Sequence, residues 1–281
     1  MLGHKLVQVL QKQFDVWTTF RGSSTEFDKF GFYDSEKVVA NIDVENFEVV
    51  RDAVFNLEPN VVINAIGIIK QTPTSNDVVK TLKINSIFPH QLAELTKKAG
   101  ARLITVSTDC VFDGRKGNYK EEDISDAADL YGKSKNLGEI SAPHCLTLRT
   151  SIIGRELQTA HSLVEWFLSS KGRKIRGFTN AVFSGFTTIV LAEIISDLIE
   201  NHSNLHGLYH VSSEPISKFD LLCLLKKFYA LPIEIEPDGD FKIDRSLNSE
   251  RFRSETGFVP DEWSTMIGRM TADSTPYADF R

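Results

Sequence analysis

The sequence contains only 3 cysteines and 7 histidines among its 281 residues. Cys110, Cys145 and Cys223 stand far apart and match neither a zinc-binding spacing nor a disulfide framework. The histidines form no H-E-x-x-H or H-x-H cluster. The sequence therefore predicts free thiols in a reducing cytoplasm and no bound metal.

Long apolar runs and an excess of basic charge are also missing. No run approaches the roughly 18 apolar residues of a membrane span, and no basic and then apolar stretch opens the sequence as in a secretion signal. The net charge of −6 provides no basic field for nucleic acid. We therefore expect a cytoplasmic protein whose partners include neither nucleic acid nor a membrane. Its 41% of hydrophobic residues suffices for a full globular core.

Short apolar runs alternate with longer amphipathic stretches, which is typical of parallel β–α units. Strands are expected at 16–20, 38–42, 61–66, 102–106, 145–150 and 208–211, and helices at 2–10, 44–56, 78–98, 188–200 and 218–229, with another beginning near residue 131. The apolar run 61–66 resembles a strand that is buried on both faces. After residue 150 the pattern becomes less regular. We expect an α/β fold with a nucleotide-binding core over 1–150. Residues 151–281 would form a smaller mixed α/β substrate lobe, with some elements returning to the core.

Tyr131 and Lys135 form a Y-x-x-x-K pattern within a predicted helix. Residues four apart lie on one helix face, so the phenol and the ammonium would be neighbours. The reference pKa of tyrosine, about 10, is too high for acid–base work at neutral pH, and a nearby cation would lower it. Taken alone, the pattern also fits an ordinary amphipathic helix face.

Ser107, Thr108 and Asp109 follow a predicted strand directly. Ligands of open α/β sheets bind outside the carboxyl ends of the strands. A hydroxyl at this point could hold a substrate carbonyl against the Tyr131 phenol. Turn formation at a strand end is the alternative interpretation.

Asn64, Ala65, Ile66 and Gly67 end another apolar strand, and Asn85 lies in the helix that follows. Small residues at a strand end let a flat ligand approach the backbone. Asn85 is polar within an otherwise apolar helix, where asparagine could also cap or kink the helix. These residues are candidates for a nucleotide-binding edge.

These features, in this order, resemble the extended short-chain dehydrogenase/reductase family, and within it the dTDP-4-dehydrorhamnose reductase group. The matching segments are 62–65 (VINA), 107–114 (STDCVFDG), 130–135 (LYGKSK) with Gly138 and Glu139, 148–151 (LRTS) with Gly154, and 207–211 (GLYHV). The resemblance spans nearly the whole chain and implies a Rossmann-type doubly wound parallel sheet. Cys110 departs from the family, which commonly has tyrosine there.

The resemblance implies a role for each site residue. Tyr131 would be the general acid, and Lys135 would bond the nicotinamide ribose and lower the tyrosine pKa. Thr108 would position the sugar carbonyl, with Ser107 as the alternative. The substrate-binding residues would be Thr108, Asp109 and Arg245.

The cofactor-binding residues expected from the resemblance are Gly3, Arg21, Asp43, Asn64, Ala65, Ile66, Gly67, Asn85, Ser107, Tyr131 and Lys135. The segment 19–24 offers Arg21 and Ser23 where an NAD-selective fold usually has an acid. NADP(H) is therefore expected in preference to NAD(H). Gly3 resembles the last glycine of the G-x-x-G-x-x-G motif, so we expect the first strand and the first two glycines to be missing from this sequence.

The implied activity is NAD(P)H-dependent reduction of a nucleotide-linked 4-keto-6-deoxysugar in surface polysaccharide synthesis. Related 4,6-dehydratases carry an acidic pair at Asp109, and Cys110 replaces its second member here, which argues against dehydration. The alternative functions are a sugar-nucleotide epimerase and a non-catalytic nucleotide-binding subunit. The resemblance also allows for a homodimer. Basic residues at 171–176 are a second candidate for the substrate phosphates, with a solvated surface loop as the alternative.

Overall fold

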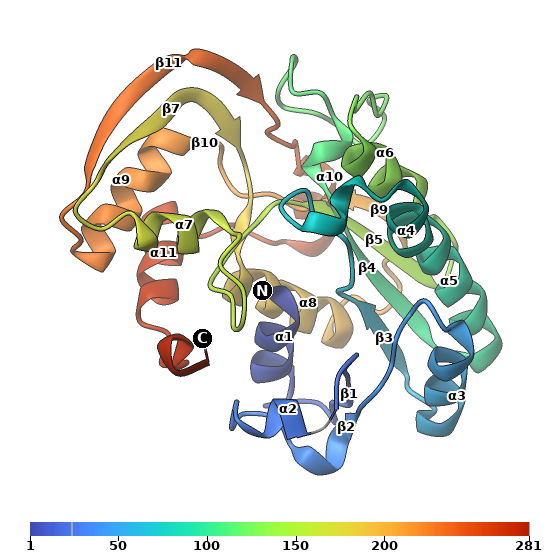
Figure 1. Cartoon of the computed structure of the whole chain (residues 1–281). Coiled ribbons are helices and arrows are strands. Elements are labelled where there is room, and N and C mark those ends of the chain that lie inside the picture. The colour runs from blue at the N-terminus through green and yellow to red at the C-terminus, as the bar shows by residue number, and fades with distance from the viewer. Residues whose placement is uncertain (24, 281) are drawn as a thin grey trace.

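Four parallel strands form the central sheet in the computed structural model, which describes residues 1–23 and 25–280. In spatial order these strands are β3 (Val61–Asn64), β4 (Arg102–Thr108), β5 (Cys145–Thr150) and β9 (Gly207–His210). Each pairs in parallel with its neighbour. The parallel sheet, with helices on both faces, confirms the predicted α/β class (Figure 1).

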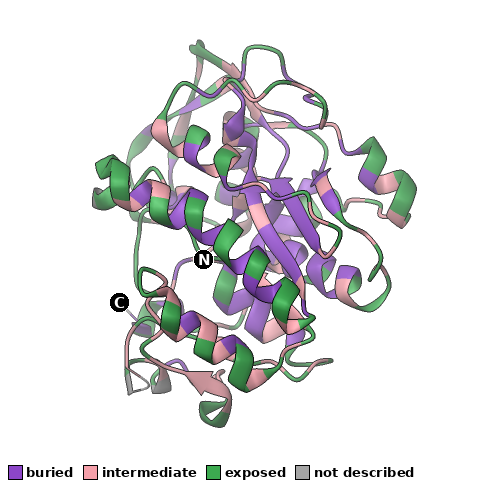
Figure 2. Cartoon of the chain, turned by 90° about the vertical axis from the view of Figure 1, so that its right-hand side faces the viewer, coloured by how far each residue is buried: buried purple, intermediate pink, exposed green. Residues whose placement is uncertain are grey.

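Alternating side chains of the strands supply two separate cores. Ile104 and Leu146, which are paired across β4 and β5, belong to the larger core. Leu103 and Cys145, one position earlier, belong to the core on the opposite face, because successive strand residues point to opposite sides. The covering helices are α1 (Leu2–Leu10) and α8 (Thr188–Glu200) on the first face, and α3 (Phe47–Leu57) and α5 (Phe88–Ala99) on the second. The helices present exposed outer faces while the strands are largely buried (Figure 2).

The helix expected over 78–98 is interrupted. It consists of α4 (Val78–Leu82), the π-helical segment η3 (Lys83–Ile87) and α5, and it ends at Gly100 with φ 71°. Pro89 lacks an N–H, so the carbonyl of residue 85 cannot accept the usual α-helical hydrogen bond. Such π-segments occur frequently at functional sites.

Strand β3 is less buried than its apolar sequence predicted. Val61, Val62 and Ile63 are only half-buried, and Ile66, just beyond the strand, is 42% exposed. The expectation of burial on both faces was wrong because β3 has only β4 as a strand partner among the described residues. The short strands β1 (Thr18–Thr19) and β2 (Val38–Val39) pair in a sheet of their own.

A second group of elements follows β5. Strands β7 (Lys174–Phe183) and β11 (Glu234–Asp244) run parallel and arch over α9 (Lys218–Tyr229), while β10 (Ile216–Ser217) pairs antiparallel with β7 (Figure 1). The other elements are α2 (Thr25–Asp28), α6 (Leu130–Leu137), β6 (Ile152–Ile153), α7 (Leu163–Ser169), β8 (Phe186–Thr187), α10 (Glu250–Thr256), α11 (Trp263–Thr271) and the 3-10 turns η1 (Ser35–Lys37), η2 (Pro73–Asn76), η4 (Asp109–Val111) and η5 (Tyr277–Phe280). Within the described ranges, no helix combines the length and apolar character that crossing a bilayer requires.

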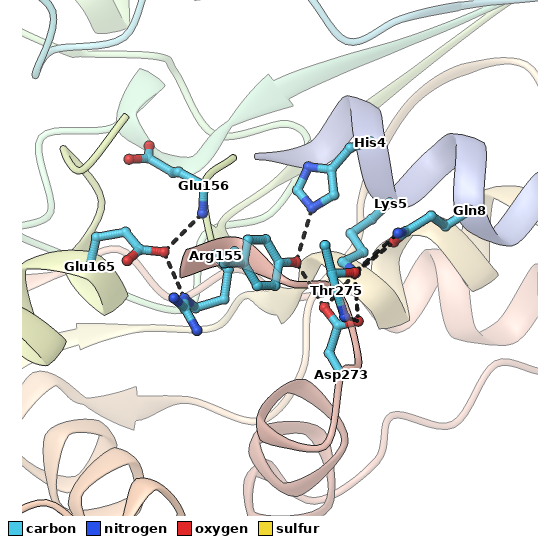
Figure 3. A network of polar contacts seen from close by, with 9 residues as sticks. His4, Lys5, Gln8, Arg155, Glu156, Glu165, Asp273 and Thr275 are labelled. Atoms are coloured by element: carbon cyan, nitrogen blue, oxygen red, sulfur yellow. Dashed lines mark hydrogen bonds and ion pairs between the residues drawn. The ribbon is translucent and has the colours of Figure 1, made fainter. Parts of the chain in front are cut away.

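A polar network ties α1 to the segment after α11 (Figure 3). Lys5 forms an ion pair with Asp273, and the two side chains are 4% and 11% exposed. The Lys5 ammonium also donates to Thr275 Oγ1 at 3.0 Å. Tyr277 donates to Asp273 Oδ2 at 2.8 Å and lies 3.0 Å from His4 Nε2. Two parts of the chain that are more than 260 residues apart are thereby joined by buried polar contacts.

The same network reaches a third segment, between β6 and α7. The Arg155 guanidinium lies 4.6 Å from the centre of the Tyr277 ring and donates to Glu165 Oε1 at 2.7 Å. Glu165 also accepts from the backbone N–H of Glu156 at 2.9 Å. Segments from the beginning, the middle and the end of the sequence therefore meet at this point (Figure 3).

Candidate active site

The candidate site lies at the carboxyl ends of β3 and β4. The segment directly after β3 is an exposed ledge that consists of Ala65, Ile66 and Gly67. Strand β4 ends at Thr108. Helix α6 brings Tyr131 to this edge. The sheet edge therefore gathers residues that the sequence places more than 60 positions apart.

Two glycines allow α6 to lie directly against its neighbours. A Cβ at Gly132 would be 2.2 Å from the carbonyl oxygen of Cys110, and a Cβ at Gly138 would be 2.0 Å from that of Asn85. Both distances are far too short for any side chain. Asp129 caps the helix by accepting from the N–H of Gly132 at 2.9 Å. The glycines thus set the distance at which the catalytic candidates meet.

Tyr131 lies close enough to the Thr108 side chain for Thr108 to affect its pKa. Burial raises the pKa of Tyr131 well above its ordinary value, and Cys110, Asp109 and Asp129 act in the same direction. Thr108 acts in the opposite direction. The expected lowering of the tyrosine pKa was wrong, because desolvation of the phenolate dominates. A phenol that is protonated at neutral pH is the form that a proton donor requires.

Lys135 follows Tyr131 by four residues on the same helix. Its ammonium donates to the carbonyl oxygen of Val106 at 2.7 Å and would lie 4.0 Å from a Cβ at Gly67. Burial lowers the pKa of Lys135 to about 8, although Glu139 acts in the opposite direction. The charge of this lysine therefore titrates close to physiological pH.

We expect cofactor binding to weaken as the pH rises through about 8, because Lys135 then loses the proton that it would donate to a cofactor ribose hydroxyl. The measurement is the dissociation constant of NADPH on both sides of this pH. Lys135→Arg should keep the charge and move the decline to higher pH. Tyr131→Phe should leave the decline in place. An identical decline in Lys135→Arg would mean that another group titrates.

Ser107 faces a different set of groups. Its hydroxyl donates to Glu139 Oε1 at 2.6 Å, and Glu139 is held by a buried ion pair with Arg149 at 2.7 Å. Neighbouring strand residues point to opposite faces, so Ser107 and Thr108 cannot both face Tyr131. The geometry thus favours Thr108 over Ser107 as the hydroxyl that positions the substrate.

Asn85 connects the ledge to α6. Its side chain accepts from the N–H of Ile68 at 2.8 Å, and it donates to the carbonyl of Ile68 at 3.0 Å and to Ser134 Oγ at 3.1 Å. Asn85 is 1% exposed, so we expect it to support cofactor binding by positioning the ledge. Asn64 has a similar place, because its side chain accepts from the N–H of Ile66 at 3.1 Å.

Asp109 and Arg245 are the predicted substrate-binding residues beside Thr108. Asp109 is 4% exposed, and burial raises its pKa while Lys218 and Arg245 act against that rise. Arg245 follows β11 and donates through Nε to the carbonyl of Phe112 at 2.9 Å. The structure therefore brings the two predicted substrate residues together.

Three predicted cofactor residues lie around the first strands. Gly3 is exposed in the first turn of α1, and nothing lies within 4 Å of the position of its missing Cβ. Arg21 is exposed after β1. The Asp43 carboxylate accepts from the N–H of Glu45 at 3.0 Å. Their contacts with a cofactor stay predictions.

The basic cluster at 171–176 is a solvated surface. Lys174 pairs with Glu236, and Arg176 lies 3.5 Å from Asp238. All its lysines and arginines are exposed. The cluster is a solvated surface as the alternative interpretation expected, but Lys174 and Arg176 lie in strand β7 and not in a loop.

Sequence reasoning missed two cations at the site. The Lys70 ammonium lies 5.6 Å from the centre of the Tyr131 ring and pairs with Asp129 at 2.7 Å. Lys218 interacts electrostatically with Asp109 from the other group of elements. Neither lysine stands in a pattern that would have identified it. Within the described ranges, no group of three or more histidine, cysteine, aspartate or glutamate side chains could hold a metal ion.

Known proteins resemble the chain in sequence and in fold. It is 32% identical over 193 residues to a dTDP-4-dehydrorhamnose reductase of Aggregatibacter actinomycetemcomitans, covering 64% of this chain and 65% of the relative. It is 26% identical to methionine adenosyltransferase 2 subunit beta of Danio rerio, covering 66% of this chain and 60% of the relative. The match thus spans less than two thirds of each relative's length.

A solved structure agrees over more of the chain. The crystal structure of a hypothetical dTDP-4-dehydrorhamnose reductase from Sulfolobus tokodaii is 27% identical and superposes with a TM-score of 0.77, covering 93% of this chain and 94% of its own. The family model described as the RmlD substrate binding domain matches residues 1–275. The chain therefore belongs to the RmlD substrate binding domain family, as the resemblance of its motifs indicated.

Proposed function

We propose that the chain is an NAD(P)H-dependent reductase that acts on a nucleotide-linked 4-keto-6-deoxysugar. The observation that carries this proposal is the placement of Thr108 close to a protonated Tyr131 at the carboxyl edge of a parallel sheet. The relative and the solved structure named as dTDP-4-dehydrorhamnose reductases support it.

The residues present fit a nicotinamide cofactor. The exposed ledge at Ala65, Ile66 and Gly67 gives a flat group access to the backbone, and the Lys135 ammonium lies beside it. When bound, the cofactor supplies the hydride that reduces the carbonyl carbon. Lys135 would hold a ribose hydroxyl. We propose that residues 1–150 bind the cofactor and that 151–281 form most of the substrate lobe.

Tyr131 and Thr108 then act on the carbonyl oxygen. Thr108 holds this oxygen by a hydrogen bond, which orients the sugar against the phenol. As negative charge develops on the oxygen, Tyr131 transfers its phenolic proton to it, and the carbonyl becomes a hydroxyl. Arg245 would contact the substrate from the end of β11.

A turnover screen tests this function. The protein would be incubated with dTDP- and UDP-linked 4-keto-6-deoxysugars and either NADH or NADPH, and oxidation of the cofactor would be followed. Stoichiometric oxidation with at least one sugar is the expected result. Conversion of a sugar without net oxidation would identify an epimerase.

We expect NADPH to be preferred over NADH because Arg21 stands where an NAD-selective fold has an acid. An arginine can pair with the 2′-phosphate that only NADP(H) carries. Arg21→Ala should raise the KM for NADPH by about tenfold, within the range of a charge-assisted hydrogen bond, and leave the KM for NADH unchanged. Equal KM values for the two cofactors in both proteins would contradict this assignment.

The similarity to a methionine adenosyltransferase subunit favours a second candidate, a nucleotide-binding subunit without turnover. Fold alone does not decide between the two functions. Binding of NADPH and of nucleoside diphosphates, with no turnover of any sugar in the screen, would support the subunit. The Tyr131 and Lys135 pair argues for the enzyme.

A further inference from the structure

Lys218 is a half-buried cation that contacts an aromatic ring. It is the first residue of α9, directly after the cap residue Ser217. Its ammonium lies 3.7 Å from the centre of the Phe183 ring. In the described part of the chain it forms no hydrogen bond and no ion pair. The ring attracts the ammonium and offsets part of the solvation that it loses at this half-buried position, and the positive charge stays available to a bound anion.

Strand β7 brings Lys218 close to Arg245, because the Lys218 ammonium lies over the ring of Phe183 and the N–H of Arg245 donates to the carbonyl of the adjacent Val182 at 2.9 Å. The ammonium interacts electrostatically with Asp109, Cys110 and Arg245. Asp109 is the residue after Thr108, so Lys218 approaches the reacting centre from the substrate lobe. Arg245 is fixed by its bond to Phe112 and holds Nη1 3.8 Å from the sulfur of Cys110.

The charges of this cluster do not balance. Lys218 and Arg245 bring two positive charges, and Asp109 brings one negative charge when it is ionised. Asp109 forms no ion pair within 4 Å among the described residues, so neither cation is held by direct contact with it. The cluster therefore carries one excess positive charge beside the site. Burial lowers the pKa of Lys218 because the buried ammonium loses solvation, and a bound anion would compensate for this loss.

We propose that Lys218, together with Arg245, binds the diphosphate of the nucleotide-linked substrate. This inference rests on the proposed function, whose substrate carries its negative charge on that group. An ammonium is a compact point charge that suits phosphate oxygens, and a guanidinium offers further donors in a fixed geometry. Lys218 thus becomes a substrate-binding residue contributed by α9.

The test is the binding of dTDP and UDP, measured by calorimetry on the full chain. Lys218→Met should weaken binding by about 10- to 100-fold, as expected for the loss of one charge-assisted contact. Lys218→Arg should retain most of the affinity. NADPH binding should stay unchanged in both variants. Lys226→Met removes the same charge from an exposed position on the same helix and should have no effect.

The outcomes separate this inference from the proposed function. Wild-type affinity in a folded Lys218→Met variant would overturn the diphosphate role and leave the reductase intact. Loss of affinity in the variant, without turnover of any sugar, would support the subsite and contradict the reductase. Failure of the wild type to bind either nucleotide would overturn both. If Lys218→Met melts below the assay temperature, Lys218→Gln gives the same comparison with a polar head.

Discussion

Tyr131→Phe is expected to lower kcat by about 10²- to 10⁴-fold, the usual contribution of a positioned acid–base group. The substitution removes the phenolic proton and keeps the ring, so the packing of α6 against Cys110 should be preserved. Tyr131 is held in its protonated form by burial, and its hydroxyl is the group that would give a proton to the reduced carbonyl. The affinity for NADPH should change little.

The comparison for this prediction is Tyr33→Phe. Tyr33 packs against the rings of Phe20 and Phe30, takes no part in the proposed proton transfer, and loses the same hydroxyl. Steady-state kinetics on both variants, with single-turnover measurements to isolate the chemical step, should show the loss only at Tyr131. Near-normal turnover by Tyr131→Phe would show that another group donates the proton.

The largest effect on stability is expected for Asp273→Asn. The substitution leaves the Lys5 ammonium buried at 4% exposure without a counter-charge. Breaking a buried ion pair by removing one partner costs about 3–5 kcal/mol of unfolding free energy. Denaturant unfolding, followed by circular dichroism, would measure the change.

Two controls identify the cause of this loss. The double variant Lys5→Met/Asp273→Leu removes both charges and should be much less destabilised than Asp273→Asn, since apolar replacement of a buried pair is often neutral. Lys174→Met breaks an exposed pair with Glu236 and should leave the transition unchanged. A double variant as unstable as the single one would show that packing, and not charge, is responsible.

Local patterns predicted the elements around the site well. The helix that ends at Gly100 and the strand that ends in Thr108 were both identified, because the period of apolar residues and a terminating glycine are local signals. The burial of β3 was overestimated, because the number of strand partners depends on topology and not on the strand's own residues. The π-helical segment around Asn85, which interrupts the helix expected over 78–98, was not predicted, although Pro89 is a local signal for it.

The chemistry of the site was predicted only in part. The motif singled out Tyr131 and Lys135 as candidates, and their roles stay predictions, but the direction of the tyrosine pKa depends on burial that no local pattern reports. The choice between Ser107 and Thr108 required their side-chain directions. Lys218 interacts electrostatically with Asp109 from more than 100 residues further along the chain, and sequence spacing cannot reveal such an interaction.

The network between α1 and the segment after α11 also has a consequence for the order of folding. Lys5 and its counter-charge at Asp273 are more than 260 residues apart in the chain, so the ammonium is synthesised long before its partner. Until residue 273 has been synthesised, the ammonium lacks this counter-charge, so we expect α1 to complete its docking only after that point. Contacts between residues so far apart in sequence slow folding, because the chain must lose the entropy of loop closure before the contact can stabilise it. We expect nascent chains that stop before residue 273 to hold α1 loosely and to expose it to proteases.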